Sequence, residues 1–146
     1  MRLLVPIDFH DATEQVLAVV RRTVAGAEAT VTLLHVAEPD PAFVGYETGP
    51  GVVRDQVAEE YRQQHRALQT HAEALRKEGI NAAALLVQGG IARTIVKEAE
   101  RLEADMIVMG THGRGAMFSL VVGSVSHAVL QLTAVPVLLV PLRKKE

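Results

Sequence analysis

Length and composition define the broad class of this protein. The chain has 146 residues, 49% of them hydrophobic, which is typical of one globular domain, so we take residues 1–146 as a single domain. Its 15 Lys and Arg against 17 Asp and Glu give a formal net charge of −2, the wrong sign for holding nucleic acid or an anionic membrane surface. Cys is absent, which excludes disulfides and thiolate sites and suits the cytoplasm, and no apolar run approaches the ~20 residues that cross a bilayer. We therefore expect a cytoplasmic protein with neither nucleic acid nor a membrane as partner.

The apolar residues follow two periodicities along the chain. Five short runs have the near-continuous apolar character of strands buried on both faces of a parallel sheet: Leu3–Asp8, Thr30–Val36, Ala82–Val87, Met106–Met109 and Val135–Val140. Between them, apolar residues recur at helical spacing in four stretches: Val16–Val24, Val53–Leu75, Ile91–Leu102 and Val125–Leu132. The alternation of strand and helix predicts a doubly wound α/β fold, an open five-stranded parallel sheet with helices on both faces.

Local signals mark several element boundaries. Asp11-Ala-Thr-Glu14 resembles a capping box and predicts that the first helix starts there, whereas Gly26 and Gly79 stand where helices should end. The segment Glu38–Gly51 holds three of the six prolines and three of the eleven glycines, and it is too long for an ordinary connection. We expect it to be a mobile loop, or a lid that orders against a bound ligand.

A glycine cluster between the fourth strand and the last helix carries the clearest functional signal. It runs from Gly110 through Gly113 and Gly115 to Gly123-Ser124. Glycine lets the backbone come close to a ligand, and N–H groups at a helix N-terminus bind anions, so phosphate is the natural guest. The Ser124 hydroxyl is suited both to donate to that ligand and to cap the helix. The cluster is neither a Walker A loop nor a GxGxxG fingerprint, and a glycine turn needed only for folding is the alternative.

The spacing of these glycines resembles a family motif. Gly110, Gly113, Gly123 and Ser124 satisfy G-x2-G-x9-G-S, which is similar to the ATP-binding motif of the universal stress protein family. The opening strand with its terminal Asp8, and the last strand, also resemble that family, and the resemblance covers essentially the whole chain. Members of the family that keep these glycines bind ATP, so the resemblance implies a site for ATP, or for AMP or ADP. It also implies a Rossmann-like sheet in the order 3-2-1-4-5.

In that order Asp8 and Gly110 end side by side at the switch point, where open α/β sheets bind ligands. The resemblance implies that Asp8 meets the ribose or a phosphate-bound Mg²⁺ ion and that Val36 offers backbone groups to adenine. Pro6 and Ile7 would wall the nucleoside side. The remaining ATP-binding candidates surround the glycine cluster: Met109, Gly110, Thr111, His112, Gly113, Arg114, Gly123, Ser124 and Val125. Arg114 would approach a polyphosphate, and the alternative is that His112 and Arg114 point to water.

Three histidines need separate interpretation. His10 stands where the family often carries a small Ser, at the mouth of the proposed pocket; we favour a solvent-facing loop residue over an altered phosphate or metal environment. His35 lies in a buried strand and is expected to be a hydrogen-bonded core residue rather than a ligand. His127, in the last helix, should pack or face solvent. The six histidines form no HxxxH or HExxH pair on a predicted helix, so no dedicated zinc site is expected.

Three classes of function fit these residues. The favoured one is an ATP-binding stress-response protein whose nucleotide occupancy governs its conformation or its choice of protein partner. The second is a slow ATPase or phosphotransferase at the same site. Because Asp8 is the only carboxylate expected there and no G-x-S-x-G elbow is present, we assign no catalytic residue and expect at most slow hydrolysis. The third is a nucleotide-free dimeric interaction protein.

The last strand predicts an interface. It is apolar at every position and would form an edge of the sheet in the order 3-2-1-4-5, an arrangement that proteins normally cover. We expect a homodimer in which two copies of this strand pair antiparallel, as the family resemblance also implies. The residues concerned are Val135, Pro136, Val137, Leu138, Leu139 and Val140. The alternative is a helix or the C-terminal tail that covers the edge within one monomer.

Overall fold

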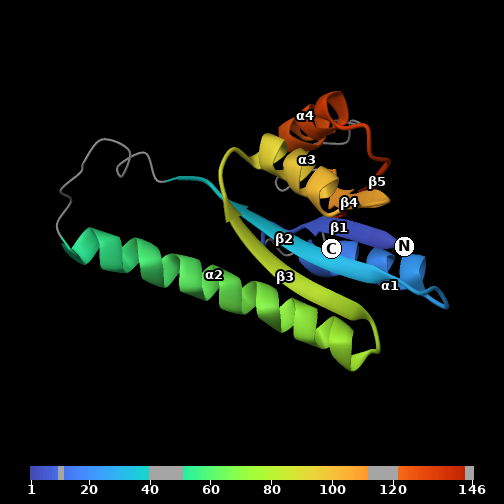
Figure 1. Cartoon of the computed structure of the whole chain (residues 1–146), viewed down its shortest axis with the longest axis horizontal. Coiled ribbons are helices and arrows are strands. Elements are labelled where there is room, and N and C mark those ends of the chain that lie inside the picture. Colours follow the sequence, from blue (N-terminus) through green and yellow to red (C-terminus); the bar gives the residue numbers. More distant parts are fainter. Residues whose placement is uncertain (10–11, 40–50, 112–121, 144–146) are drawn as a thin grey trace.

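The fold is an open parallel sheet between two layers of helices (Figure 1). The computed structural model describes residues 1–9, 12–39, 51–111 and 122–143, with residues 51–54 described by their backbone alone. The elements in chain order are β1 (Arg2–Pro6), α1 (Thr13–Val24), β2 (Thr30–Ala37), α2 (Gly51–Lys77), β3 (Asn81–Gln88), α3 (Ile91–Arg101), β4 (Met106–Gly110), α4 (Ser124–Leu132) and β5 (Val137–Val140). The strands pair in parallel in the order β3-β2-β1-β4-β5, which confirms the predicted fold class and strand order.

Alternation along the strands divides the core into two layers. Leu3, Val5 and Ile7 face one side of the sheet and pack with α1 and α2, whereas Leu4 faces the other side and packs with α3 and α4. Leu3, Leu4 and Val5 are all at most 2% exposed, so the central strand is apolar at consecutive positions because both its faces are covered. Figure 1 shows α3 and α4 above the sheet and α2 below it.

The helices bury the stripes that their periodicity predicts, with two exceptions. In α1, Val16, Leu17, Val20 and Val24 are all buried. In α4, Val129 is fully buried, but Leu132 is 51% exposed because the helix ends there and turns away from the core. The apolar stripe of α2 is fully buried only in its C-terminal half, at Leu68, Ala72 and Leu75.

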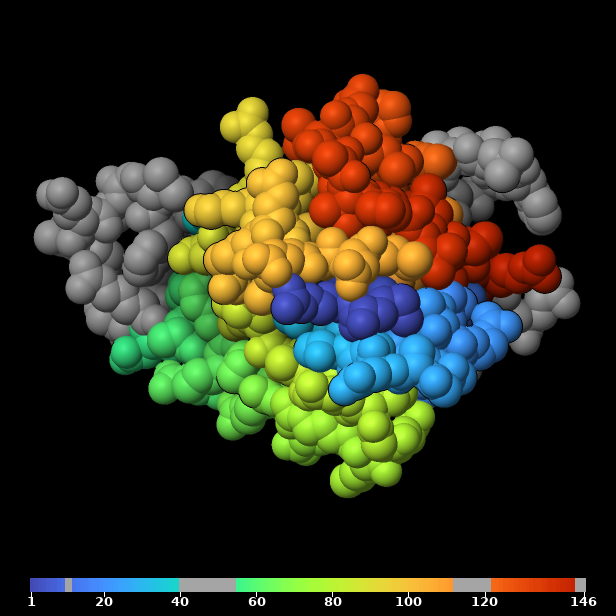
Figure 2. Space-filling view, turned by 45° about the vertical axis from the view of Figure 1, so that its right-hand side comes forward, coloured from blue at the N-terminus to red at the C-terminus, as the bar shows by residue number. Residues whose placement is uncertain are grey.

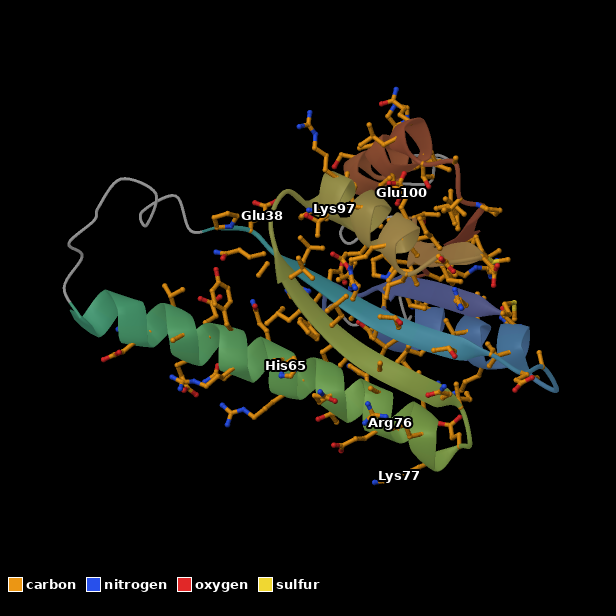
Figure 3. The ribbon with its side chains drawn as sticks, in the orientation of Figure 1. Glu38, His65, Arg76, Lys77, Lys97 and Glu100 are labelled. Carbon is orange, nitrogen blue, oxygen red and sulfur yellow. The ribbon has the colours of Figure 1, made fainter. Side chains whose placement is uncertain are left out.

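Helix α2 is longer than the sheet that it covers. Its 27 residues span about 40 Å at 1.5 Å per residue, against about 26 Å for the eight residues of β3. Figure 1 shows its N-terminal turns continuing beyond the sheet, which explains why Val57 and Tyr61 are only half-buried. At the other end Arg76 donates from Nε to the carbonyl of Ala82 at 2.7 Å and fastens α2 to β3 (Figure 3).

Glycines follow the ends of two helices as predicted, and the first helix starts at Thr13, within the predicted segment Asp11–Glu14. Gly26 and Gly79 adopt φ of +71° and +83°, which non-glycine residues avoid. At the start of α1 the N-cap is Ala12, with no side-chain cap bond, and Asp11 lies outside the described residues. The Glu14 carboxylate pairs with Arg21 two turns along the helix, and the capping box that would join Glu14 to Asp11 stays a prediction.

The strand bounds differ from the predicted ones by two residues at the end of β1 and at the start of β5, and by at most one residue elsewhere. The last strand begins at Val137 rather than Val135, because the Val135 N–H donates to Thr133 Oγ1 at 2.9 Å. Pro136, which has no N–H, contributes only its carbonyl, as acceptor for the Ile107 N–H at 2.9 Å. The first strand ends at Pro6, so Asp8 lies beyond the sheet ladder.

The amino edge of the sheet is closed by the N-terminus. The Met1 ammonium group donates to the Glu28 carbonyl at 3.0 Å, and the Arg2 N–H donates to Asp105 Oδ2 at 2.6 Å. Figure 2 shows these first residues, in dark blue, between the orange segment before β4 and the blue segment before β2. The carboxyl ends of the strands, by contrast, surround a cavity.

Candidate functional site

A cavity of about 490 Å³ lies at the carboxyl edge of the sheet, between β1 and β4. At this point the strand order reverses, because β2 and β3 lie on one side of β1 whereas β4 and β5 lie on the other. Ten of the thirteen predicted nucleotide-site residues line it: Pro6, Ile7, Asp8, Val36, Met109, Gly110, Thr111, Gly123, Ser124 and Val125. The other three, His112, Gly113 and Arg114, lie outside the described residues, as do His10 and positions 40–50 of the predicted lid. The structure thus gathers residues from four distant parts of the sequence into one concave surface.

The end of β1 places Asp8 at the mouth of this cavity. The Ile7 N–H still donates to the Leu34 carbonyl at 2.7 Å, so the chain follows β2 up to that residue. Phe9 then adopts φ of +61°, a left-handed conformation that turns the chain away from the sheet and toward α1. Asp8, between these two residues, is exposed. A carboxylate in this place is able to accept hydrogen bonds from a ligand that enters the cavity.

His35 belongs to the cavity wall as well as to the packed sheet. Its Nδ1 lies 2.7 Å from the Ile7 carbonyl oxygen, and because a carbonyl only accepts, Nδ1 carries the proton in this contact. The Phe9 ring packs against the imidazole with ring centroids 4.5 Å apart. The predicted hydrogen bond is therefore present. His35 is nevertheless half-buried and lines the cavity, since it stands near the carboxyl end of β2, directly before Val36.

Hydrogen bonds around the end of β4 hold the start of α4 in place. Ser126, 2% exposed, donates from Oγ to the Gly110 carbonyl at 2.9 Å and lies 3.3 Å from the Thr111 carbonyl. The Gly123 N–H donates to the Thr111 carbonyl at 2.6 Å. A Cβ on Gly110 would lie 2.6 Å from Leu142 Cδ1, so this glycine allows close packing. These contacts fix the first turn of α4 beside the cavity.

The N-cap of α4 is Gly123, not Ser124. The predicted capping role of the Ser124 hydroxyl is therefore wrong, because Ser124 is already the first helical residue and has no hydroxyl-to-backbone cap bond. Its side chain is exposed and lines the cavity. The N–H groups at this helix start carry the positive end of the helix dipole, which favours an anion.

Several lining residues were missed by sequence reasoning. They are Ala12, Thr13, Val16, Leu34, His35, Ile91, Ile95, Ser126 and Leu142. Leu142 follows β5 and is held there by α1: the Gln15 amide donates to the Arg143 carbonyl at 2.8 Å and accepts from the Arg143 N–H at 3.0 Å. For Ala12 and Thr13 the position directly after the Asp8 turn was a usable signal, whereas nothing local marks Leu142.

The electrostatics of the cavity favour a ligand with an apolar part and an anionic part. Most of its lining is aliphatic, and Asp8 is the only carboxylate among the lining residues that the structure describes. The starts of α1, α3 and α4 all contribute residues to it, and each presents the positive end of a helix dipole. Within the described ranges, no cluster of three or more His, Asp or Glu is arranged to hold a metal ion.

The sheet order and the cavity at its switch point define an open α/β protein with a crevice where folds of this class commonly bind ligands. A sequence model of the Universal stress protein family matches residues 1–141. The chain therefore belongs to the universal stress protein family.

Known proteins resemble the chain along its whole length. A universal stress protein encoded in the QAH/OAS sulfhydrylase 3′ region of Thermus aquaticus is 34% identical over 139 residues, covering 94% of this chain and 96% of that protein. The solved structure of hypothetical protein MJ0577 has a TM-score of 0.80 at 28% identity and covers 99% and 97% of the two chains.

Two further structures of the family contain adenine nucleotides. One is a universal stress protein from Archaeoglobus fulgidus in complex with dAMP, with a TM-score of 0.64, 24% identity and coverage of 96% of this chain and 97% of that one. The other is a universal stress protein in complex with cAMP, with a TM-score of 0.65, 18% identity and coverage of 97% and 96%. At these identities the likeness concerns the fold. As for membranes, no helix in the described part of the chain is both long and apolar enough to cross one.

Proposed function

We propose that this protein binds an adenine nucleotide, ATP in the first place, in the cavity at the carboxyl edge of the sheet, and acts as a nucleotide-responsive regulatory module. The observation that carries the proposal is the convergence of Asp8, Val36 and the start of α4 on one cavity of about 490 Å³. That volume lies within the range of about 300–1,000 Å³ typical of small-molecule sites. The nucleotide complexes of two family members support the same ligand class.

Each part of the nucleotide has a matching part of the cavity. The aliphatic side chains near the ends of β2 and α3, Val36 and Ile91 among them, suit the adenine ring. Asp8 suits the ribose hydroxyls, because a carboxylate accepts hydrogen bonds from them. The helix start at Gly123–Val125, with the glycines of the G-x2-G-x9-G-S motif, suits the phosphates.

A magnesium ion would have few protein ligands in this site. Mg²⁺ is commonly held by one or two carboxylates together with substrate phosphates. Asp8 is the one carboxylate among the described lining residues, so the ion would depend on the nucleotide for most of its ligands. Because the described lining residues include one carboxylate and no Lys or Arg, we propose that any hydrolysis is slow and that the nucleotide acts by occupancy.

The test is nucleotide binding by the purified protein and two aspartate variants. A ligand that binds only the native state raises stability by about 2.7 kcal/mol at 100 times its Kd, so saturating ATP should raise the melting temperature by several degrees. Asp8→Ala should weaken ATP binding, whereas Asp55→Ala, which removes an exposed carboxylate on α2, should leave it unchanged. Absence of any shift with ATP, ADP or AMP would refute the proposal and favour a nucleotide-free interaction protein.

The same proposal includes a homodimer that forms through strand β5. Protein partners would bind at this edge too, and their binding would depend on whether the cavity holds a nucleotide. Strand β5 pairs only with β4 in the described sheet, and Val137, Leu138 and Leu139 are half-buried. An apolar edge strand of this kind is a template for pairing with another chain. Light scattering after size exclusion should show a dimer for the wild type and for Ala67→Lys on exposed α2, and monomer or aggregate for Leu138→Lys. A monomeric wild type at micromolar concentration would refute the dimer.

A further inference from the structure

The first turn of α1 flanks the end of β4 on the face opposite to α4. Its residues Ala12 and Thr13 line the same cavity as Ser124 and Val125 of α4. The hydrogen bonds between Gln15 and Arg143 place this turn beside the segment that follows β5, which is the phosphate side of the proposed site. Two helix starts therefore approach Gly110, one from each face of the sheet.

Thr13 has an unusual polar group at this place. The residue is only 8% exposed, and its Oγ1 is buried with no hydrogen-bond partner in the part of the chain that the structure describes. Buried hydroxyls are normally paired, because one without a partner has lost its bonds to water and regained nothing. The N-cap residue of α1 is Ala12, whose methyl side chain supplies no acceptor for the N–H groups of this helix start.

We propose that the start of α1, with the Thr13 hydroxyl, is a second anion subsite that takes the terminal phosphate of a nucleoside triphosphate. This inference rests on the proposed function, since it assigns to that site a determinant of phosphate-chain length. The glycines and α4 hold the first phosphates of the chain, and the last phosphate accepts from the Thr13 hydroxyl and from N–H groups of the first turn. A nucleoside monophosphate is too short to reach both helix starts.

The geometry requires one small movement. Thr13 lines the cavity but its Oγ1 is buried, so the proposal requires a rotation about χ1 that brings the hydroxyl to the cavity surface. The same cavity is lined by apolar side chains, among them Val16 on the next turn of α1 and Leu142 after β5, and by the polar residues Thr111 and Ser124. Two carboxylates stand near this subsite among the described residues: Asp8, whose exposed charge is screened by water, and Glu14 in the first turn of α1, whose charge is paired with Arg21.

The experiment compares calorimetric titrations of ATP and AMP into four full-length proteins. Thr13→Val keeps the shape of the side chain and removes the hydroxyl, so it should weaken ATP about tenfold, the value of one hydrogen bond to a charged group, and AMP less than twofold. Thr13→Ser should retain the wild-type preference for ATP. Thr23→Val is the matched control: its hydroxyl donates to the Val19 carbonyl at 2.8 Å on the same helix, far from the cavity, so its loss should not alter the ATP/AMP ratio.

Two outcomes overturn the inference while leaving the proposed function intact. Equal losses of ATP and AMP affinity in Thr13→Val would assign Thr13 to packing, and unchanged affinities for both nucleotides would show that no phosphate reaches it. If the wild type binds neither nucleotide, the proposed function fails first and this inference with it. Should Thr13→Val fold poorly, amide resonances of Ala12, Thr13 and Glu14 in the wild type give the second measure, because they should shift with ATP and not with AMP. Equal shifts with both ligands refute the subsite.

Discussion

Replacement of Ser126 by Ala tests whether one buried hydroxyl holds the cavity wall together. The Ser126 hydroxyl donates to the Gly110 carbonyl at 2.9 Å, and this bond joins α4 to the end of β4. The Thr111 carbonyl, 3.3 Å from the same hydroxyl, keeps its stronger bond from the Gly123 N–H at 2.6 Å. The substitution therefore removes one strong donor, from Gly110, and leaves the second carbonyl satisfied.

The expected loss of stability follows from this count. A hydrogen bond contributes about 0.5–1.5 kcal/mol net, and a buried carbonyl left without its donor costs about 1–3 kcal/mol, so we expect a loss of about 1.5 kcal/mol. At about 2.1 cal/mol/K of unfolding entropy per residue, a chain of 146 residues has an unfolding entropy of about 0.3 kcal/mol/K. The melting temperature of Ser126→Ala should accordingly fall by about 5 °C.

Urea denaturation and calorimetry measure the two quantities independently. Ser124→Ala is the matched control, because it makes the same chemical change two residues earlier on the same helix, at an exposed side chain. Its stability should stay within about 0.5 kcal/mol of the wild type, as is usual for surface substitutions. A Ser126→Ala protein as stable as Ser124→Ala would mean that α4 is held by its apolar contacts alone, and the reasoning about this hydroxyl would be refuted.

Other expectations concern the core, a turn and a surface network. Leu17→Ala, at a fully buried position, should lower the free energy of unfolding measured in urea by about 2–5 kcal/mol, and a smaller loss would mean that α1 shifts to fill the space left by the removed side chain. Gly26→Ala should cost about 1–2 kcal/mol, because φ is +71° although nothing lies within 4 Å of the added Cβ; a neutral result would show that the turn relaxes. Burial alone would lower the pKa of Arg21, but its hydrogen bonds to Glu78 and Glu14 raise it above the ordinary value, so Arg21 stays charged. Glu78→Gln should cost less than about 1 kcal/mol, and the loss should shrink in 0.5 M salt; a salt-independent loss would contradict an ionic origin.

The helices and strands were predictable because their signals are local. The spacing of apolar residues along a strand or a helix reflects which face is buried. Apolar positions such as Leu4 and Leu17 therefore indicated that both faces of β1 and one stripe of α1 are buried, as they are. The strand order came from the family resemblance, since periodicity does not state which strands are neighbours. Local hydrogen bonding that periodicity does not reveal moved the start of β5: the Val135 N–H bonds to the Thr133 side chain two residues earlier and Pro136 has no N–H, so β5 starts two residues late.

The candidate site was predictable where glycines and a strand end mark it. Asp8, Gly110 and Gly123 lie in the cavity as expected, because strand ends and glycine turns are visible in a single sequence. Leu142 could not be predicted to line the cavity, because a hydrogen-bonded pair with Gln15, 128 positions from Arg143 in the chain, brings its segment there. His35 was expected in the core because its strand is buried, but the end of that strand opens onto the cavity.

The central place of β1 in the sheet has a consequence for the order in which the molecule assembles. Arg2 pairs with Thr30 on one side, while Leu3 pairs with Met106 on the other, so one neighbour is close in the chain and the other is remote. Closing the short loop costs less chain entropy than closing the long one, so we expect β1, β2 and β3 to pair first, as one half of the sheet, before β4 and β5 complete both core layers. The cavity lies at the seam between that half and β4, and its walls meet only when the second half docks. A ligand that contacts both halves in this cavity would therefore stabilise their docking against each other.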